Sequence, residues 1–187
     1  MLILASKSPR RQKLMGEDIT KDFIIKTYEI DEEASYSLPP LNAVRDIAKR
    51  KGQEAFLFNP QDTILSADTI VVIDNEIIGK PRDKEDAKRI LKKLSGRTHQ
   101  VITGYYIINK DKKLLNHVIS EVTFNSLSDE LIESYIQSGS PMDKAGAYGF
   151  QDNDTYPIVK EVKGSIKNVI GFPSDEIKVD LKNIGVL

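Results

Sequence analysis

The chain has 187 residues, of which 40% are apolar and 29% charged, and its 27 basic and 28 acidic side chains leave a formal net charge of −1. This length suits one domain with a sizeable core or two small lobes, and the near-neutral charge argues against a broad nucleic-acid-binding surface. The absence of cysteine excludes disulfides, thiolate nucleophiles and cysteine metal sites. The sequence shows neither a signal peptide nor an 18-residue apolar run, so we expect a cytoplasmic protein that does not enter a membrane.

The chain alternates strands and helices without internal repeats. Ser8 and Pro9 suit the N-cap and the first position of a helix, and the Asp74-Asn75 pair suits a hairpin turn. Such alternation predicts an α/β fold, and the hairpins make its sheet mixed, with room for two lobes around a cleft. In chain order, the expected elements are a strand over 2–5, a helix over 9–16, a strand over 23–25, a helix over 41–58, a strand over 63–73 with its partner 76–79, a helix between Asp83 and Gly96, strands over 99–109 and 113–125, a helix over 128–138, a strand over 156–162, a loop over 164–168 and a helix over 174–181.

The segment over residues 4–11, Leu-Ala-Ser-Lys-Ser-Pro-Arg-Arg, joins the first strand to the first helix. Arg10 and Arg11 fall in the first helical turn, where the helix macrodipole disfavours cations unless an anion joins them. With the free N–H groups of the helix start and the hydroxyls of Ser6 and Ser8, they form the parts of a phosphate-binding site. The alternative is a capped helix with solvated arginines, and these eight residues alone leave both open.

Four further charged residues stand at positions that are unusual for their type. Asp68 lies within the most apolar strand, where an unpaired carboxylate is costly, although a hydrogen bond to a neighbouring turn would also explain it. Lys51 falls on the apolar face of its helix, from which a long lysine can also reach solvent. Lys80 closes the turn after the hairpin and Glu32 stands in an acidic triplet, and both also suit an ordinary surface.

Together, these carboxylates and cations favour the attack of water on a phosphoryl group. Carboxylates can hold a divalent cation and accept a proton, while lysine and arginine offset the charge of a phosphate chain. Strand ends and helix starts are also where open α/β sheets place ligand sites. The sequence has no P-loop, no dinucleotide-binding glycine motif and no Gly-x-Ser-x-Gly elbow, and its two histidines, His99 and His117, lack the neighbours of a zinc site.

Three blocks of sequence occur in order along nearly the whole chain. The blocks are Leu-Ala-Ser-Lys-Ser-Pro-Arg-Arg at 4–11, Ala-Asp-Thr-Ile-Val at 67–71 with Gly-Lys-Pro at 79–81 and Leu-Ser-Gly-Arg-Thr-His at 94–99, and Asp-Lys-Ala-Gly-Ala-Tyr-Gly-Phe-Gln at 143–151. Together they resemble the Maf family of nucleotide pyrophosphatases. The resemblance implies an elongated α/β fold in which a mixed sheet with flanking helices forms two lobes around a central cleft, similar to inosine triphosphate pyrophosphatases. It also implies a single domain over residues 1–187, within which no clear linker occurs.

The resemblance implies a house-cleaning hydrolase that splits a nucleoside triphosphate into monophosphate and pyrophosphate with Mg²⁺ or Mn²⁺, and it is compatible with a homodimer. At three selectivity positions, Arg10, Thr69 and Gln151, the chain is similar to the branch that acts on dTTP and UTP. By motif position, Asp68 would accept the proton and Glu32 would join it at the metal. The implied phosphate-binding residues are Ser6, Arg10, Arg11, Lys51 and Lys80.

The chain departs from the family pattern at three places. Asp152 stands where glycine is expected, directly after Gln151, so the preference among dTTP, UTP and modified pyrimidine nucleotides is open. Gly52 replaces alanine after Lys51, and Phe172 replaces leucine.

Two other functions also stay open. One is a regulator that binds nucleotides or a division-septum partner without turnover, which the family's association with septum formation suggests. The other is nucleic-acid binding through the basic segments, for which a near-neutral chain offers little surface.

Overall fold

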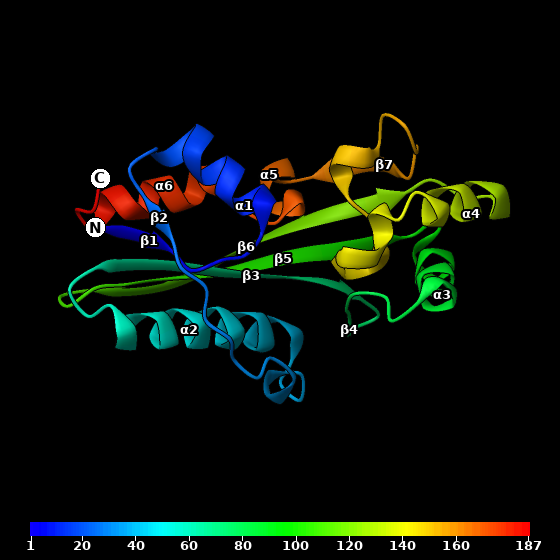
Figure 1. Ribbon diagram of the computed structural model, residues 1–187. Coiled ribbons are helices and arrows are strands. Elements are labelled where there is room, and N and C mark those ends of the chain that lie inside the picture. Colours follow the sequence, from blue (N-terminus) through cyan, green and yellow to red (C-terminus); the bar gives the residue numbers. More distant parts are fainter. The chain divides into compact units, whose positions relative to one another are not determined.

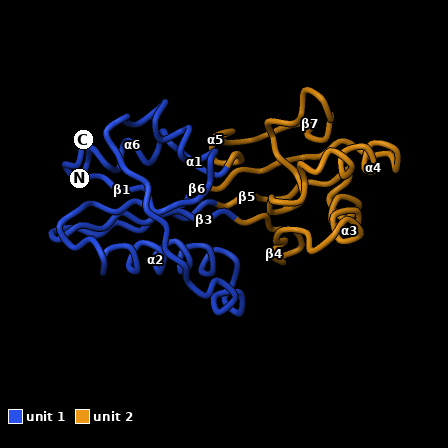
Figure 2. The backbone as a smooth tube through the Cα atoms, viewed as in Figure 1, with its two compact units in different colours: residues 1–69, 103–118, 171–187 blue, residues 70–102, 119–170 orange.

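The structure, a computed structural model, describes residues 1–187 and divides into two compact units (Figures 1 and 2). Unit 1 comprises residues 1–69, 103–118 and 171–187, and unit 2 comprises residues 70–102 and 119–170. None of the helices combines the length and the hydrophobicity needed to cross a lipid bilayer. The elements are β1 (Leu2–Leu4), α1 (Pro9–Leu14), β2 (Ile24–Ile25), α2 (Pro40–Phe58), β3 (Thr63–Ile73), β4 (Glu76–Ile78), α3 (Lys84–Leu94), β5 (Thr98–Ile108), β6 (Lys113–Phe124), α4 (Asp129–Gln137), β7 (Val159–Lys163), α5 (Ile166–Ile170) and α6 (Ser174–Asn183).

The strands form a mixed sheet, which confirms the predicted α/β class. Its hydrogen-bonded order is β2-β1-β3-β5-β6-β7, and β4 pairs with β3 outside this path. β1 lies parallel to both β2 and β3, whereas β4 is antiparallel to β3 and β7 is antiparallel to β6. The β3–β4 pair is a hairpin, whose short turn can join only antiparallel neighbours, whereas a long connection that contains α4 joins β6 to β7.

Local sequence signals located most element boundaries. Ser8 caps α1, where its Oγ accepts a hydrogen bond from the backbone N–H of Arg11 at 3.4 Å. Asp74 and Asn75 adopt positive φ angles of 52° and 61° in the β3–β4 turn, as a two-residue hairpin loop requires. Beyond α1 the helix continues as one π-helical turn over Met15–Ile19.

The predicted loop over residues 164–168 is wrong, because it contains most of the short helix α5. Ser165 Oγ accepts the backbone N–H of Asn168 at 3.1 Å, which stabilises the first turn. The buried side-chain amide of Asn168 then donates to Val101 O at 3.1 Å and to Ser120 Oγ at 3.0 Å. Tertiary hydrogen bonds of this kind leave no periodic pattern in five residues.

In unit 1, successive residues of β3 face opposite sides of the sheet. Ile64 packs in one buried cluster with Ala55 of α2, whereas Leu65 packs in another with Ile177 and Leu181 of α6. Figure 1 shows the same arrangement, with α2 along one face of these strands and α1 and α6 along the other. Because side chains alternate along a strand, this register decides which helix Asp68 and Thr69 meet.

Helix α2 lies close to the sheet at Gly52. A Cβ atom at this position would lie 2.6 Å from Ser66 Oγ and 2.7 Å from Tyr106 Cδ1, both too close for real atoms. The Ser66 hydroxyl fills the space beside Gly52 and donates a 2.7 Å hydrogen bond to Ala48 O of α2. Glycine at this position therefore leaves room for the Tyr106 ring opposite it.

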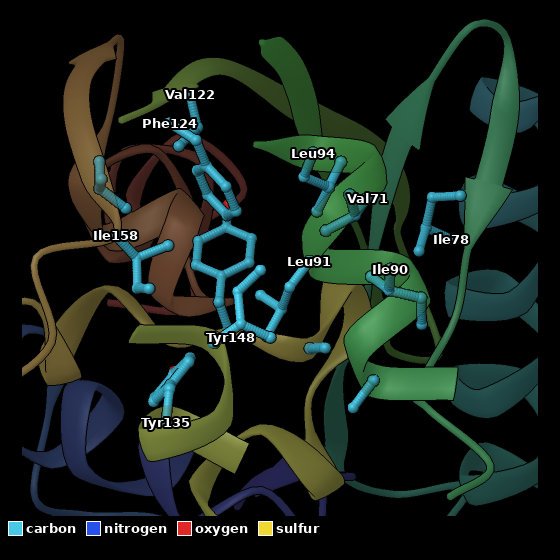
Figure 3. Packing of buried hydrophobic residues seen from close by; sticks show 14 of the residues in the cluster. Val71, Ile78, Ile90, Leu91, Leu94, Val122, Phe124, Tyr135, Tyr148 and Ile158 are labelled. Atoms are coloured by element: carbon cyan, nitrogen blue, oxygen red, sulfur yellow. The ribbon is translucent and has the colours of Figure 1, made fainter. Parts of the chain in front are cut away.

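Unit 2 has its own apolar core, built by α3, α4 and the strands beside them (Figure 3). The rings of Phe124 and Tyr148 meet edge to face at 4.7 Å, and His99 packs against both. His99 Nε2 lies 2.7 Å from Tyr148 Oη, while the buried Nδ1 has no hydrogen-bond partner. Burial lowers the pKa of His99 to about 4.

The close approach at Gly52 predicts an unusual response to substitution. Alanine normally stabilises a helix relative to glycine by about 1 kcal/mol, but Gly52→Ala should lower the free energy of unfolding by about 1–3 kcal/mol because α2 must move away from Ser66 and Tyr106. Urea denaturation measures this change. The control is Gln53→Ala on the exposed side of the same helix, which should leave stability unchanged. A Gly52→Ala protein at least as stable as its parent would contradict the packing described.

The buried imidazole predicts a specific pH dependence. Because the pKa of His99 falls from 6.5 to about 4 on folding, the unfolded chain binds more protons between these values. The contribution of the neutral imidazole to the free energy of unfolding is fully present above pH 6.5. It is lost as the pH falls towards 4, which lowers the free energy of unfolding by up to about 3 kcal/mol. In His99→Gln this part of the acid destabilisation should disappear. Denaturation curves across this pH range give the free energy of unfolding of both proteins. A difference between the two proteins that stayed constant with pH would refute the account.

Candidate active site

The N-terminus of α1 collects hydroxyls, backbone N–H groups and cations. Ser6 Oγ accepts the backbone N–H of Ser8 at 3.2 Å, which fixes the turn between β1 and α1. Arg10 and Arg11 follow Pro9 in the first helical turn, and this turn contains no acidic residue. The structure therefore places Ser6 and Arg10 where the sequence predicted a phosphate site, and their phosphate-binding role stays a prediction.

On the α2 face of β3, Lys51 joins two carboxylates. Its Nζ lies 2.9 Å from Asp68 Oδ1 and 2.7 Å from Glu32 Oε1. Asp68 is only 8% exposed, and the Lys51 side chain is 18% exposed, so the lysine turns towards the carboxylates instead of extending into solvent. Charge pairing offsets the cost of burying Asp68 in a strand. Three of the predicted residues, separated in sequence, thus meet at one point.

The segment that carries Glu32 is held on α2 by a second set of contacts. Asp46 Oδ2 accepts hydrogen bonds from Ser35 Oγ at 2.7 Å and from Arg50 Nε at 2.9 Å. Arg50 also donates from Nη1 to Asp31 O at 2.7 Å. We did not predict a role for Asp46 or Arg50. Their spacing of four residues on one helix was a usable signal for an ion pair, but it did not reveal the loop that the pair holds.

Beside this segment, Tyr36 faces the same negative charges. Burial raises the pKa of Tyr36, and the charges of Asp68 and Glu32 raise it further. The phenol is therefore a neutral donor at ordinary pH. Tyr36 remains 47% exposed.

On the other face of β3, Arg11 bonds to the backbone around Asp68. Its Nη1 donates to Ala67 O at 2.8 Å, its Nη2 to Thr69 Oγ1 at 3.0 Å and its Nε to Gly171 O at 2.8 Å. Burial lowers the pKa of Arg11, and the negative charge of Asp68 opposes that shift. The guanidinium predicted to hold phosphate is thus engaged by three acceptors of unit 1.

Two predicted residues, Lys80 and Gln151, belong to unit 2, and both are exposed. Gly79, which precedes Lys80, accepts a 3.2 Å hydrogen bond at its carbonyl from the N–H of Gly146. The turn that carries Lys80 therefore touches the glycine-rich loop that leads to Gln151. Their roles in phosphate binding and base recognition stay predictions.

Asp152, the residue that departs from the family pattern, turns away from solvent into a local network. Its Oδ2 accepts hydrogen bonds from Tyr135 Oη at 2.8 Å and from Ser140 Oγ at 2.6 Å. Tyr135 Oη in turn accepts the N–H of Gly149 at 2.9 Å. The carboxylate therefore ties the loop around Gln151 to α4.

The carboxylates of Glu32 and Asp68 fit a divalent cation. Mg²⁺ is commonly held by one or two carboxylates, with water and substrate phosphates as the remaining ligands. Both carboxylates reach the same ammonium group within 3 Å, so they converge on one point. No group of three or more His, Cys, Asp or Glu side chains is arranged to hold a metal.

Comparison with known proteins places the chain in a family. The profile of the Maf-like protein family matches residues 1–184. A protein of Thermococcus onnurineus named dTTP/UTP pyrophosphatase is 45% identical over 185 residues, which cover 99% of this chain and 98% of the relative. A protein of the same name from Symbiobacterium thermophilum is 42% identical over 172 residues, covering 92% of this chain and 88% of the relative.

The fold is similar to that of the Staphylococcus aureus Ham1 protein, with a TM-score of 0.56 and 98% coverage of both chains. At 11% identity this likeness concerns the fold alone. The family profile and the relatives, by contrast, match in sequence over nearly the whole chain. The chain belongs to the Maf-like protein family.

Proposed function

We propose that this protein hydrolyses dTTP and UTP to the nucleoside monophosphate and pyrophosphate. The observation that carries the proposal is that the ammonium group of Lys51 lies between the carboxylates of Glu32 and Asp68. Asp68 lies on β3, and Arg11, from the start of α1, binds the other face of this strand. The names of the relatives support the choice of substrate. A homodimer is a further expectation from the family, which light scattering of the purified protein tests.

In this proposal, Asp68 accepts the proton of the water that attacks the α-phosphorus. Its carboxylate is held in place by Lys51, and a fixed general base needs no reorganisation during the reaction. Lys51, already beside the carboxylates, offsets the charge of the phosphate chain. Ser6 and Arg10 bind phosphate oxygens at the N-terminus of α1, where backbone N–H groups favour anions. Lys80 adds a further cation, and Gln151 reads the base.

Glu32 and Asp68 would hold the Mg²⁺ or Mn²⁺ ion. When bound, this ion offsets phosphate charge and lowers the pKa of water. Lys51 holds the two carboxylates together, because both ion pairs share its Nζ.

A panel of nucleoside triphosphates tests the function directly. The protein is incubated with each triphosphate and Mg²⁺ or Mn²⁺, and both monophosphate and pyrophosphate are quantified by ³¹P NMR. We expect equal amounts of both products, with dTTP and UTP turned over fastest. Nucleotide binding without product would favour the regulator, and release of orthophosphate would contradict the proposed bond cleavage.

Loss of the general base should remove most of the activity. Asp68→Asn should lower kcat for dTTP by about 10²–10⁴-fold, because the amide cannot accept the proton. The matched control is Asp22→Asn, an exposed aspartate in the loop before β2, which should keep the parent rate. Circular dichroism and thermal unfolding verify that both variants are folded. Pyrophosphate release by folded Asp68→Asn at the parent rate would refute this role.

A further inference from the structure

The contacts of Arg11 fix the orientation of its guanidinium within the protein. A guanidinium carries five N–H donors on three nitrogens, and each nitrogen makes a bond of 3.0 Å or less to Gly171 O, Ala67 O or Thr69 Oγ1. A further contact, from Nη1 to Ser6 Oγ, measures 3.5 Å and is weak. Since all three nitrogens are anchored, the plane of the group cannot turn to meet a phosphate without breaking protein hydrogen bonds.

The hydroxyl of Thr69 is also fully engaged. A hydroxyl has one donor and two acceptor positions. Thr69 Oγ1 accepts from Arg11 Nη2 at 3.0 Å, lies 2.9 Å from Thr103 Oγ1 and lies 3.2 Å from Gly171 O. A carbonyl can only accept, so Thr69 donates to Gly171 and accepts from Thr103. No hydrogen-bonding capacity remains on this hydroxyl for a nucleotide base.

Strand geometry separates this network from the carboxylate of Asp68. Side chains of adjacent residues in a strand point to opposite faces of the sheet. Asp68 meets Lys51 of α2 on one face, whereas Thr69 meets Arg11 of α1 on the other. Arg11 also holds Ala67 O, so its hydrogen bonds flank Asp68 on both sides along the chain.

We propose that Arg11 is a positioning residue that holds the backbone of Asp68, and that Thr69 and Thr103 act through it. The proposal rests on the function assigned to Asp68 above. It replaces direct phosphate binding by Arg11, and it gives the selectivity position Thr69 an indirect role. Thr103 is fully buried in β5 and cannot touch substrate. Selectivity at position 69 then arises from the placement of the strand and of Gly171, not from a hydrogen bond to the base.

A double-mutant cycle between Thr69 and Thr103 tests the network. Thr69→Val and Thr103→Val preserve side-chain shape but remove a hydroxyl. Each should lower kcat for dTTP about fivefold, the effect of one net hydrogen bond, with KM changed less than about twofold. The double variant should be no slower than the slower single variant, because both act on one network. Thr69→Ser and Thr103→Ser, which keep the hydroxyl, should retain the parent kcat.

Direct base reading predicts a different result. Thr69→Val would then raise KM and change the ratio of dTTP to UTP turnover, while Thr103→Val would behave as the parent. That pattern would overturn the proposal. Thermal unfolding of every variant shows whether a loss of kcat reflects loss of fold.

A second measurement observes Arg11 without relying on turnover. In the ¹⁵N-labelled parent, the Nε–H signal of Arg11 is assigned by its loss in Arg11→Lys and followed while pyrophosphate and Mg²⁺ are added. The proposal predicts an exchange-protected signal that does not move with pyrophosphate but changes in Thr69→Val. An Arg11 signal that titrates with pyrophosphate, or that ignores Thr69→Val, would refute it.

The two measurements separate this inference from the proposed function. A parent protein that releases no pyrophosphate from any triphosphate would refute the function, and the response of the Arg11 signal to Thr69→Val would still decide whether Arg11 is anchored. An active parent in which Thr69→Val and Thr103→Val behave differently would refute the inference alone.

Discussion

The ion pair between Lys51 and Asp68 is the interaction on which the rest of unit 1 depends. Asp68 lies in a strand that is buried on both sides, and a carboxylate there is costly without a partner. Lys51 can reach it only because α2 lies close to the sheet, and the missing side chain at Gly52 permits this approach. The packing of α2 and the Lys51–Asp68 ion pair are therefore coupled. Gly52 allows α2 to lie close to the sheet, and this position puts the ammonium group within reach of the carboxylate.

The opposite face of β3 is constrained by a different kind of contact. Arg11 binds carbonyl and hydroxyl oxygens next to Asp68 instead of the carboxylate itself. Its charge still acts on the site, because Asp68 and Glu32 oppose the lowering of its pKa by burial. Contacts on both faces of β3 hold the Asp68 side chain in one orientation, which a general base requires.

Sequence reasoning recovered the elements with a clear period, and it singled out residues whose charge was unusual for their position. Asp68 and Lys51 were each marked by a charge at an apolar position, but no spacing rule joins a strand to a preceding helix, so their pairing came from the structure. Arg11 was expected to bind phosphate from its place in the first helical turn. The sequence could not show that Gly171, which is distant in the chain, lies against α1 and accepts a hydrogen bond from Arg11. The helix α5 was missed because its stability comes from Asn168 contacts with other strands.

In the proposed mechanism, water activated by Asp68 attacks the α-phosphorus of the substrate. Hydrolysis of dTTP in H₂¹⁸O, followed by mass spectrometry of both products, tests it most directly. Attack at the α-phosphorus places one ¹⁸O atom in the monophosphate and none in the pyrophosphate. Label in the pyrophosphate would mean attack at the β-phosphorus and would contradict the account.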